Sequence, residues 1–183
     1  MTENPKTERC NDKLAKMLKT SVLIKFLFEQ IQLSGCTIPK ITCVQTENKV
    51  FGAISSTGDI ELNPIISSRT HLETTLAHEL VHVYDKCTVD FDQLNLKHLA
   101  CTEVRANTLS GECRLSREIM RGQLGISGHF KYLFSDFRDC VFRRSVLGMQ
   151  QLLKNGDEKI AREAVSKVFD ACFGDLAPFD EIY

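Results

Sequence analysis

The stretch LAHELVHVYDKC, at residues 76–87, constrains the fold most, because it places two histidines four positions apart with a glutamate directly after the first. Positions four apart on an α-helix lie one above the other, so His78 and His82 can turn both imidazoles toward one point. Zn²⁺ binds neutral imidazole, and a catalytic zinc site uses three protein ligands and a water. Glu79 lies at the edge of the same face, where its carboxylate can accept a proton from that water. The stretch therefore predicts a helix with a zinc site, and an ordinary amphipathic helix is the alternative.

The residues around this motif favour a well-formed helix. Thr70 followed by Glu73 has the pattern of a capping box, which predicts a helix start just upstream. Apolar residues then recur at helical spacing on one side: Leu72, Leu76, Leu80 and Val83. The other side carries polar residues: Thr75, His78, Glu79, His82 and Asp85. The motif is therefore expected inside a helix rather than across a loop.

A third metal ligand is expected from another element, and the segment LNLKHLACTEVRANTLSGEC offers His98 and Glu103. On one helix these two side chains lie about 140° apart, so they cannot both serve. We predict Glu103, which lies on the next expected helix, as the third ligand of a single zinc ion. The alternative ligand is His98, which otherwise is a capping or core histidine. Asn107 is one turn beyond Glu103 and is a candidate to hydrogen-bond a ligand imidazole.

Composition limits the remaining possibilities. A chain of 183 residues with 43% apolar residues is expected to form one globular domain over residues 1–183, with residues 1–11 flexible. The net charge of −1 gives no electrostatic reason to expect nucleic acid as a partner. The apolar run VLIKFLF is far shorter than the roughly 20 residues of a membrane span. The start MTENPKTERCNDK has neither the apolar core of a secretory signal nor the composition of a mitochondrial presequence.

Eight cysteines are spread over the whole chain, and no two are spaced as C-x-x-C. This spacing argues against a zinc ribbon and against a thioredoxin-like redox pair. Two interpretations stay open from the residues alone: buried free thiols in a reducing compartment, or disulfides in an oxidising one.

The pattern along the chain predicts an α+β fold. Helices are expected over 12–33 (with Ser21 as an internal cap), 94–119, 131–153 and 158–173, in addition to the motif helix. Strands are expected over 41–45, 50–55 and 59–63, the last two as a hairpin. The predicted architecture is a zincin-like metallopeptidase domain, in which a small sheet or hairpin precedes the active-site helix and the C-terminal half is mainly helical.

Several motifs together resemble the mitochondrial inner-membrane metalloprotease family called ATP-twenty-three. The resemblance is carried by the histidine motif with its following aromatic residue, Asp85 and Cys87, then by KHLACTEVRA and LSGEC, and continues in SGC at 34–36, Cys140 and VFDACFGDLAPF at 168–179. It covers most of the chain and is weaker in the amino-terminal third. The resemblance implies a zinc endopeptidase with His78 and His82 as metal ligands and Glu79 as the catalytic residue.

The same resemblance implies a location and partners. The family acts in the intermembrane space, peripherally bound to the inner membrane, where it processes a mitochondrially made ATP synthase subunit precursor and assists assembly of the membrane sector. That compartment oxidises cysteine-rich proteins, which favours disulfides here. Family members carry further cysteines where this chain has Thr46 and Asn63, so the loss of one disulfide would leave eight cysteines able to pair.

Two other functions remain as alternatives. One is a SprT-like protease of protein crosslinked to DNA, which should carry a basic DNA-binding surface that this sequence does not show. The other is a non-proteolytic assembly chaperone with a vestigial motif, against which the intact motif argues. The oligomeric state is not predicted.

Overall fold

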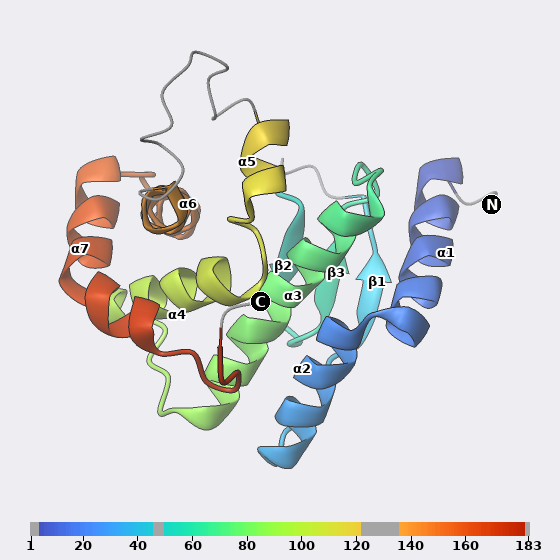
Figure 1. Ribbon diagram of the computed structural model, residues 1–183, viewed down its shortest axis with the longest axis horizontal. Coiled ribbons are helices and arrows are strands. Elements are labelled where there is room, and N and C mark those ends of the chain that lie inside the picture. The colour runs from blue at the N-terminus through green and yellow to red at the C-terminus, as the bar shows by residue number, and fades with distance from the viewer. Residues whose placement is uncertain (1–3, 46–49, 122–135, 182–183) are drawn as a thin grey trace. The chain divides into compact units, whose positions relative to one another are not determined.

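The computed structural model describes residues 4–45, 50–121 and 136–181. The chain divides into two compact units, Met1–Asp90 and Phe91–Tyr183, which are described separately. The first contains helices and a small sheet and the second contains helices, so the α+β fold class is confirmed (Figure 1).

Two consecutive helices open the first unit, α1 (Pro5–Thr20) and α2 (Val22–Leu33). Ser21 separates them, and its hydroxyl accepts a hydrogen bond from the backbone N–H of Ile24 at 3.1 Å, as expected for an N-cap. The helix expected from residue 12 begins earlier, at Pro5. Asn4 caps α1 by accepting from the N–H of Lys6, and proline is favourable in the first turn of a helix.

Three short strands form one sheet in the order β1-β3-β2: β1 (Ile41–Cys43), β2 (Gly52–Ile54) and β3 (Ile60–Leu62). The predicted hairpin is confirmed, because β2 and β3 are antiparallel with Ala53 opposite Glu61. The strand β1 pairs with β3 in parallel, which the sequence did not predict. The strand β2 therefore lies at one edge of the sheet.

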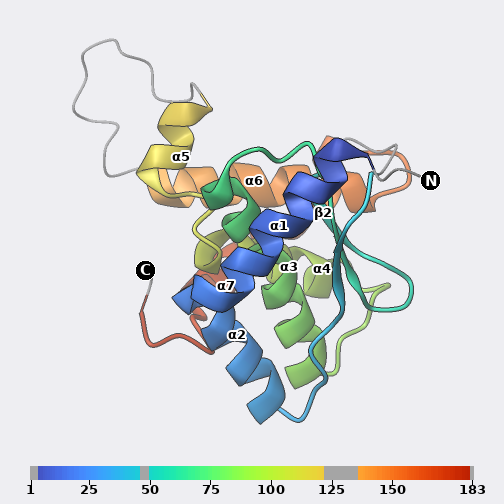
Figure 2. The same ribbon diagram turned by 90° about the vertical axis from the view of Figure 1, so that its right-hand side faces the viewer.

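The helix α3 (Arg69–Thr88) carries the histidine motif and packs against β2, β3 and α2 (Figure 2). The predicted capping box at Thr70 is wrong, since Ser68 is the N-cap and accepts from the N–H of His71 at 3.4 Å. Buried residues also lie around more of the circumference of this helix than an amphipathic pattern suggests. Leu72, Leu76 and Leu80 are fully buried, as expected, but Val83 is only partly buried while the neighbouring Val81 is fully buried.

The described residues of the second unit form four helices: α4 (Leu96–Leu109), α5 (Leu115–Met120), α6 (Asp136–Leu152) and α7 (Glu158–Gly174). The helix expected over 94–119 is broken, because Gly111 adopts a φ of 79° directly after the C-cap Ser110 and ends α4. The expected helices over 131–153 and 158–173 match α6 and α7, although residues 131–135 lie outside the described residues. The helices α4, α6 and α7 pack against one another around a shared apolar core.

Arg105 fastens the chain beyond α7 to α4. This buried guanidinium donates to the backbone oxygen of Asp175 at 2.7 Å and to that of Ala177, and it pairs with the Asp175 carboxylate at 2.7 Å. Arg105 lies in the stretch KHLACTEVRA, and Asp175 and Ala177 lie in VFDACFGDLAPF, two of the stretches that carry the family resemblance. The two stretches are therefore in direct contact: one lies on α4, and the other includes the segment beyond α7 that Arg105 binds.

All eight cysteines form disulfides, two in each unit: Cys10–Cys43, Cys36–Cys87, Cys101–Cys172 and Cys113–Cys140. The expectation of complete pairing is confirmed, and the alternative of free thiols is wrong. Among the described residues, no helix is both long and apolar enough to cross a membrane.

Candidate active site

The helix α3 presents His78, Glu79 and His82 in adjacent turns of one continuous helix. The two imidazole rings lie 4.7 Å apart between centroids and are inclined by 83° to each other. His82 and Glu79 are each only 8% exposed, and His78 is half-buried. The sequence prediction that both imidazoles share a helix face is therefore confirmed. The carboxylate of Glu79 between them is largely shielded from solvent.

The edge strand β2 approaches the helix closely at Gly52. A Cβ on this residue would lie 2.8 Å from Cγ2 of Thr75 and 2.9 Å from Oε1 of Glu79, closer than real Cβ contacts. The strand therefore lies against the Glu79 side chain because residue 52 has none. We did not predict this contact, although an isolated glycine inside a strand pattern often marks a close backbone approach.

Glu103 lies in the second unit on α4, where it is 6% exposed. Its surroundings within that unit come from α6: a Cβ on Gly148 would lie 2.6 Å from Cδ of Glu103 and closer still to Oε2. Burial lowers the pKa of Arg144, and the negative charges of Glu112 and Glu103 oppose that change. The carboxylate of Glu103 is thus held between two helices rather than exposed on the surface.

Asn107, expected near a ligand imidazole, makes different contacts. Its amide donates to the backbone oxygen of Glu103 at 2.8 Å and to the hydroxyl of Ser145 at 3.4 Å. Ser145 in turn donates to the backbone oxygen of Val141 at 2.8 Å. Asn107 therefore joins α4 to α6 beside Glu103.

His98 has a structural role. Its Nδ1 accepts a hydrogen bond from the backbone N–H of Asp92 at 3.1 Å, and its ring lies 6.1 Å from that of Phe91. These contacts fix the segment that leads into α4, which agrees with the capping alternative for this histidine.

The residues predicted as metal ligands are two histidines of the first unit, His78 and His82, and a carboxylate of the second, Glu103, of which the last two are buried. Two imidazoles and one carboxylate form a donor set that zinc enzymes use, and three protein ligands leave a fourth position for water. The chemistry of these donors therefore fits zinc.

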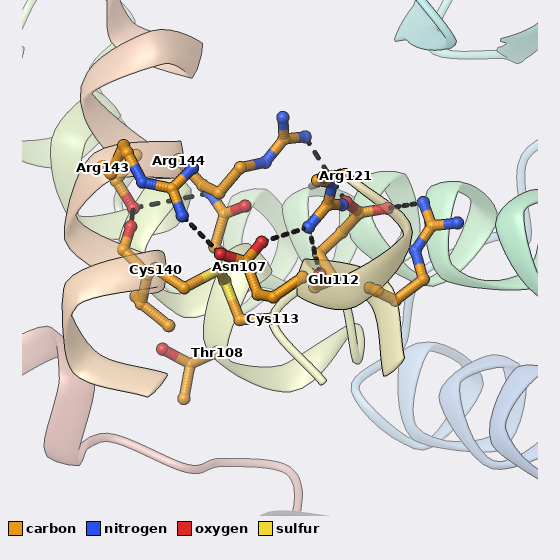
Figure 3. The surroundings of a disulfide bond; sticks show 12 residues. Asn107, Thr108, Glu112, Cys113, Arg121, Cys140, Arg143 and Arg144 are labelled. Carbon is orange, nitrogen blue, oxygen red and sulfur yellow. Dashed lines mark hydrogen bonds and ion pairs between the residues drawn. A yellow bond between two sulfur atoms is a disulfide. The ribbon is translucent and has the colours of Figure 1, made fainter. Parts of the chain in front are cut away.

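A buried ionic cluster lies at the junction of α4, α5 and α6 (Figure 3). Glu112 and Glu118 are 4% and 3% exposed, and four arginines surround them: Arg117, Arg121, Arg143 and Arg144. Glu112 pairs with Arg117 and Arg144 at 3.4 Å each, and Arg121 contacts both glutamates. Burial lowers the pKa of Arg117, and the Glu112 charge opposes that change.

A disulfide next to Glu112 also links this cluster to α6. Figure 3 shows Cys113, directly after Glu112, bonded to Cys140 of α6. The sequence did not indicate that these charged residues are buried, because their spacing resembles that of solvated helix faces.

Comparisons with known proteins agree with these features. The model of the Peptidase M76 family matches residues 8–180. A mitochondrial inner membrane protease ATP23 from Coccidioides immitis is 40% identical over 187 residues, covering 99% of this chain and 76% of that protein. One from Yarrowia lipolytica is 37% identical, covering 95% of this chain and 68% of that protein.

A human protein named mitochondrial inner membrane protease ATP23 homolog is 34% identical, covering 96% of this chain and 70% of that protein. No solved structure matches the chain. The family match extends over nearly the whole sequence and includes every residue of the candidate site. The chain therefore belongs to the Peptidase M76 family, a family of metallopeptidases.

Proposed function

We propose that this chain is a zinc-dependent endopeptidase with a zincin-like active-site arrangement, which processes the precursor of an ATP synthase membrane subunit. We also propose that it assists assembly of the ATP synthase membrane sector. The names of its relatives, mitochondrial inner membrane proteases, support this assignment. The match to Peptidase M76 favours it over the SprT-like alternative.

The proposed location is the intermembrane space, with peripheral contact to the inner membrane. Complete pairing of the cysteines supports an oxidising compartment, since disulfides are rare in reducing ones. The protein substrate is the partner that a peptidase requires, and we propose no nucleic acid partner.

One zinc ion would be held by His78, His82 and Glu103. When bound, zinc polarises a substrate carbonyl and lowers the pKa of a coordinated water to about 7. Glu79 is not a ligand in this arrangement, so its carboxylate remains available for proton transfer.

Glu79 acts as general base and then as general acid. Its carboxylate accepts a proton from the attacking water and donates that proton to the leaving amine as the peptide bond breaks. Burial of Glu79 beside β2 limits the number of positions that its carboxylate can occupy. A restricted carboxylate requires less reordering when the water is deprotonated.

The strand β2 provides the substrate-binding edge in this proposal. Its inner edge pairs with β3, and among the described residues no strand pairs with its outer edge. An extended substrate segment can add there as a further strand through backbone hydrogen bonds. Gly52 places that edge directly beside Glu79, so the scissile bond of a bound segment would lie near the catalytic carboxylate.

The observation that carries the proposal is the arrangement of His78, Glu79 and His82 on one helix face beside the sheet edge. The replacement Glu79→Gln preserves the size of the side chain but removes the base. We expect it to keep zinc and fold while precursor cleavage falls roughly 10²- to 10⁴-fold. Glu73→Gln, earlier on the same helix, is the matched control and should cleave normally.

Normal cleavage by the Glu79→Gln variant would exclude the enzymatic role of Glu79. Assembly of ATP synthase should be measured in the same cells. Assembly that survives the loss of cleavage would show that the chaperone function rests on surfaces other than the catalytic group.

A further inference from the structure

Gly148 lies in the interior of α6 and faces the Glu103 side chain of α4. A Cβ at this position would be 2.6 Å from Cδ of Glu103 and 3.1 Å from Oε1, where an ordinary contact begins at 3.4 Å. The carboxyl group therefore occupies the space that any other residue at position 148 would need.

The backbone conformation does not explain this glycine. Gly148 has no positive φ, unlike Gly111 and Gly156 in the same unit, so an alanine is compatible with its backbone. Glycine in a helix interior destabilises the helix relative to alanine. The structural reason for a glycine here is therefore the space that it leaves for a neighbouring group.

The backbone next to that carboxyl group is linked to α6 through Asn107. The backbone of Glu103 accepts a hydrogen bond from Asn107, which is also bonded to Ser145 on α6. The Asn107–Ser145 hydrogen bond and the shared apolar core hold α4 against α6, so the helices do not separate easily to admit a side chain. The end of the Glu103 side chain yields more readily than the two helix backbones, because it can move by rotation about side-chain bonds.

We propose that Gly148 is a positioning residue for the metal ligand Glu103, which it allows to hold its carboxylate in the ligating position. This inference rests on the proposed role of Glu103 as third ligand. An alanine would push Cδ of Glu103 by roughly 0.8 Å, and the closer Oε2 by more, to reach an ordinary contact distance. Metal–ligand distances tolerate deviations of only about 0.2 Å. The larger displacement of Glu103 would therefore break or distort the coordination.

The test compares Gly148→Ala with Gly174→Ala in the full chain. The control glycine is also helical, and a Cβ there would meet nothing within 4 Å. Zinc affinity is measured by competition with a chelator, and the ligand geometry by the visible absorption of the Co²⁺-substituted protein. We expect Gly148→Ala to lose about 10- to 100-fold in zinc affinity and to change the Co²⁺ spectrum, with the thermal unfolding of the metal-free protein unchanged or raised. Gly174→Ala should match the parent protein in both measurements.

A double-mutant cycle with Glu103→Asp provides a second measurement. Aspartate is shorter by one methylene, so its carboxylate leaves room for a methyl group at position 148. In a chain that already carries Glu103→Asp, Gly148→Ala should change zinc affinity by no more than about twofold. If Gly148→Ala alone does not fold, the double variant decides: a folded, zinc-binding double variant supports the inference, and an unfolded one overturns it.

Glu103→Ala separates this inference from the proposed function. If Glu103→Ala retains the parent zinc affinity, the ligand assignment fails and the role of Gly148 fails with it. If Glu103→Ala loses zinc while Gly148→Ala retains it with an unchanged Co²⁺ spectrum, only the positioning role is overturned.

Discussion

Gly52 of β2 lies so close to Glu79 of α3 that a Cβ on the glycine would be 2.9 Å from the glutamate Oε1. The contact joins the edge of the sheet to the proposed catalytic base within one unit. Thr75 completes this contact, at 2.8 Å from the same hypothetical atom. The position of the carboxylate is thus determined by the strand as well as by its own helix.

Gly52→Ala should therefore impair catalysis while leaving the metal in place. The added methyl group displaces the Glu79 carboxylate, and misplacement of a catalytic group by about 1 Å can cost 10²-fold in rate. We expect kcat for precursor cleavage to fall roughly 10- to 100-fold with a full complement of zinc. Ala53→Ser is the control, because successive side chains of a strand point to opposite faces. Equal activities of the Gly52→Ala variant and the parent would contradict this role.

Metal content distinguishes the two candidates for the third ligand. His78→Ala and His82→Ala should each remove most of the bound zinc, and Glu103→Ala should do the same. His98→Ala should retain zinc, since Nδ1 of this histidine accepts a hydrogen bond from Asp92, and Nε2 of a neutral imidazole then carries the hydrogen and cannot bind a metal. Metal analysis of the purified variants checks this prediction. Zinc lost from the His98 variant but kept in the Glu103 variant would reverse the assignment.

The disulfides should contribute unequally to stability. The protein as folded should react with no thiol reagent, and eight thiols should appear after denaturation and reduction. Each disulfide typically contributes about 2 to 4 kcal/mol to the free energy of unfolding. Cys101–Cys172 closes 71 residues and Cys113–Cys140 closes 27, so chain entropy favours the longer loop by about 1 kcal/mol. Denaturant unfolding of the two double serine variants measures the difference, and a larger loss from the shorter loop would contradict the entropic account.

Glu112 should be more important for stability than an exposed glutamate. Glu112→Gln leaves the buried Arg117 with less compensating charge, and breaking a buried ion pair costs about 3 to 5 kcal/mol. Glu158→Gln removes one partner of the exposed pair with Arg162 and should cost about 0.5 kcal/mol or less. Urea unfolding of both variants gives the comparison. Equal losses would show that the buried cluster is not specifically stabilising.

The sequence was informative where local chemistry determines structure. The spacing of His78 and His82 predicted their shared helix face, and Ser21 was identified as a cap between two helices. These features depend on contacts between residues fewer than five positions apart, for which helix geometry is sufficient.

Prediction failed where several local signals compete. Thr70 and Glu73 match a capping box, yet the cap is Ser68, another residue of a type that favours this position, whose hydroxyl accepts from the N–H of His71. The break after Ser110 was missed, although Gly111 in LSGEC was a visible signal for a left-handed residue that ends a helix.

Contacts between residues far apart in the chain could not be predicted from the sequence. Nothing in the pattern showed that β1 pairs in parallel with β3, or that Gly52 and Gly148 each lie against a glutamate of a neighbouring helix. The burial of Glu112 was also missed, because a charged residue near others of opposite charge is more often exposed. The ligand set and the assignment of residues 1–183 to one domain remain predictions.

The distribution of the disulfides has a consequence for the order in which the molecule can mature. Both cross-links of the first unit are complete at Cys87, and both cross-links of the second begin at Cys101 or later. The cysteines of the first unit thus need no partner from later in the chain. Residues 1–90 can therefore be fully cross-linked while the rest of the chain is still extended, so that each half matures independently of the oxidation of the other.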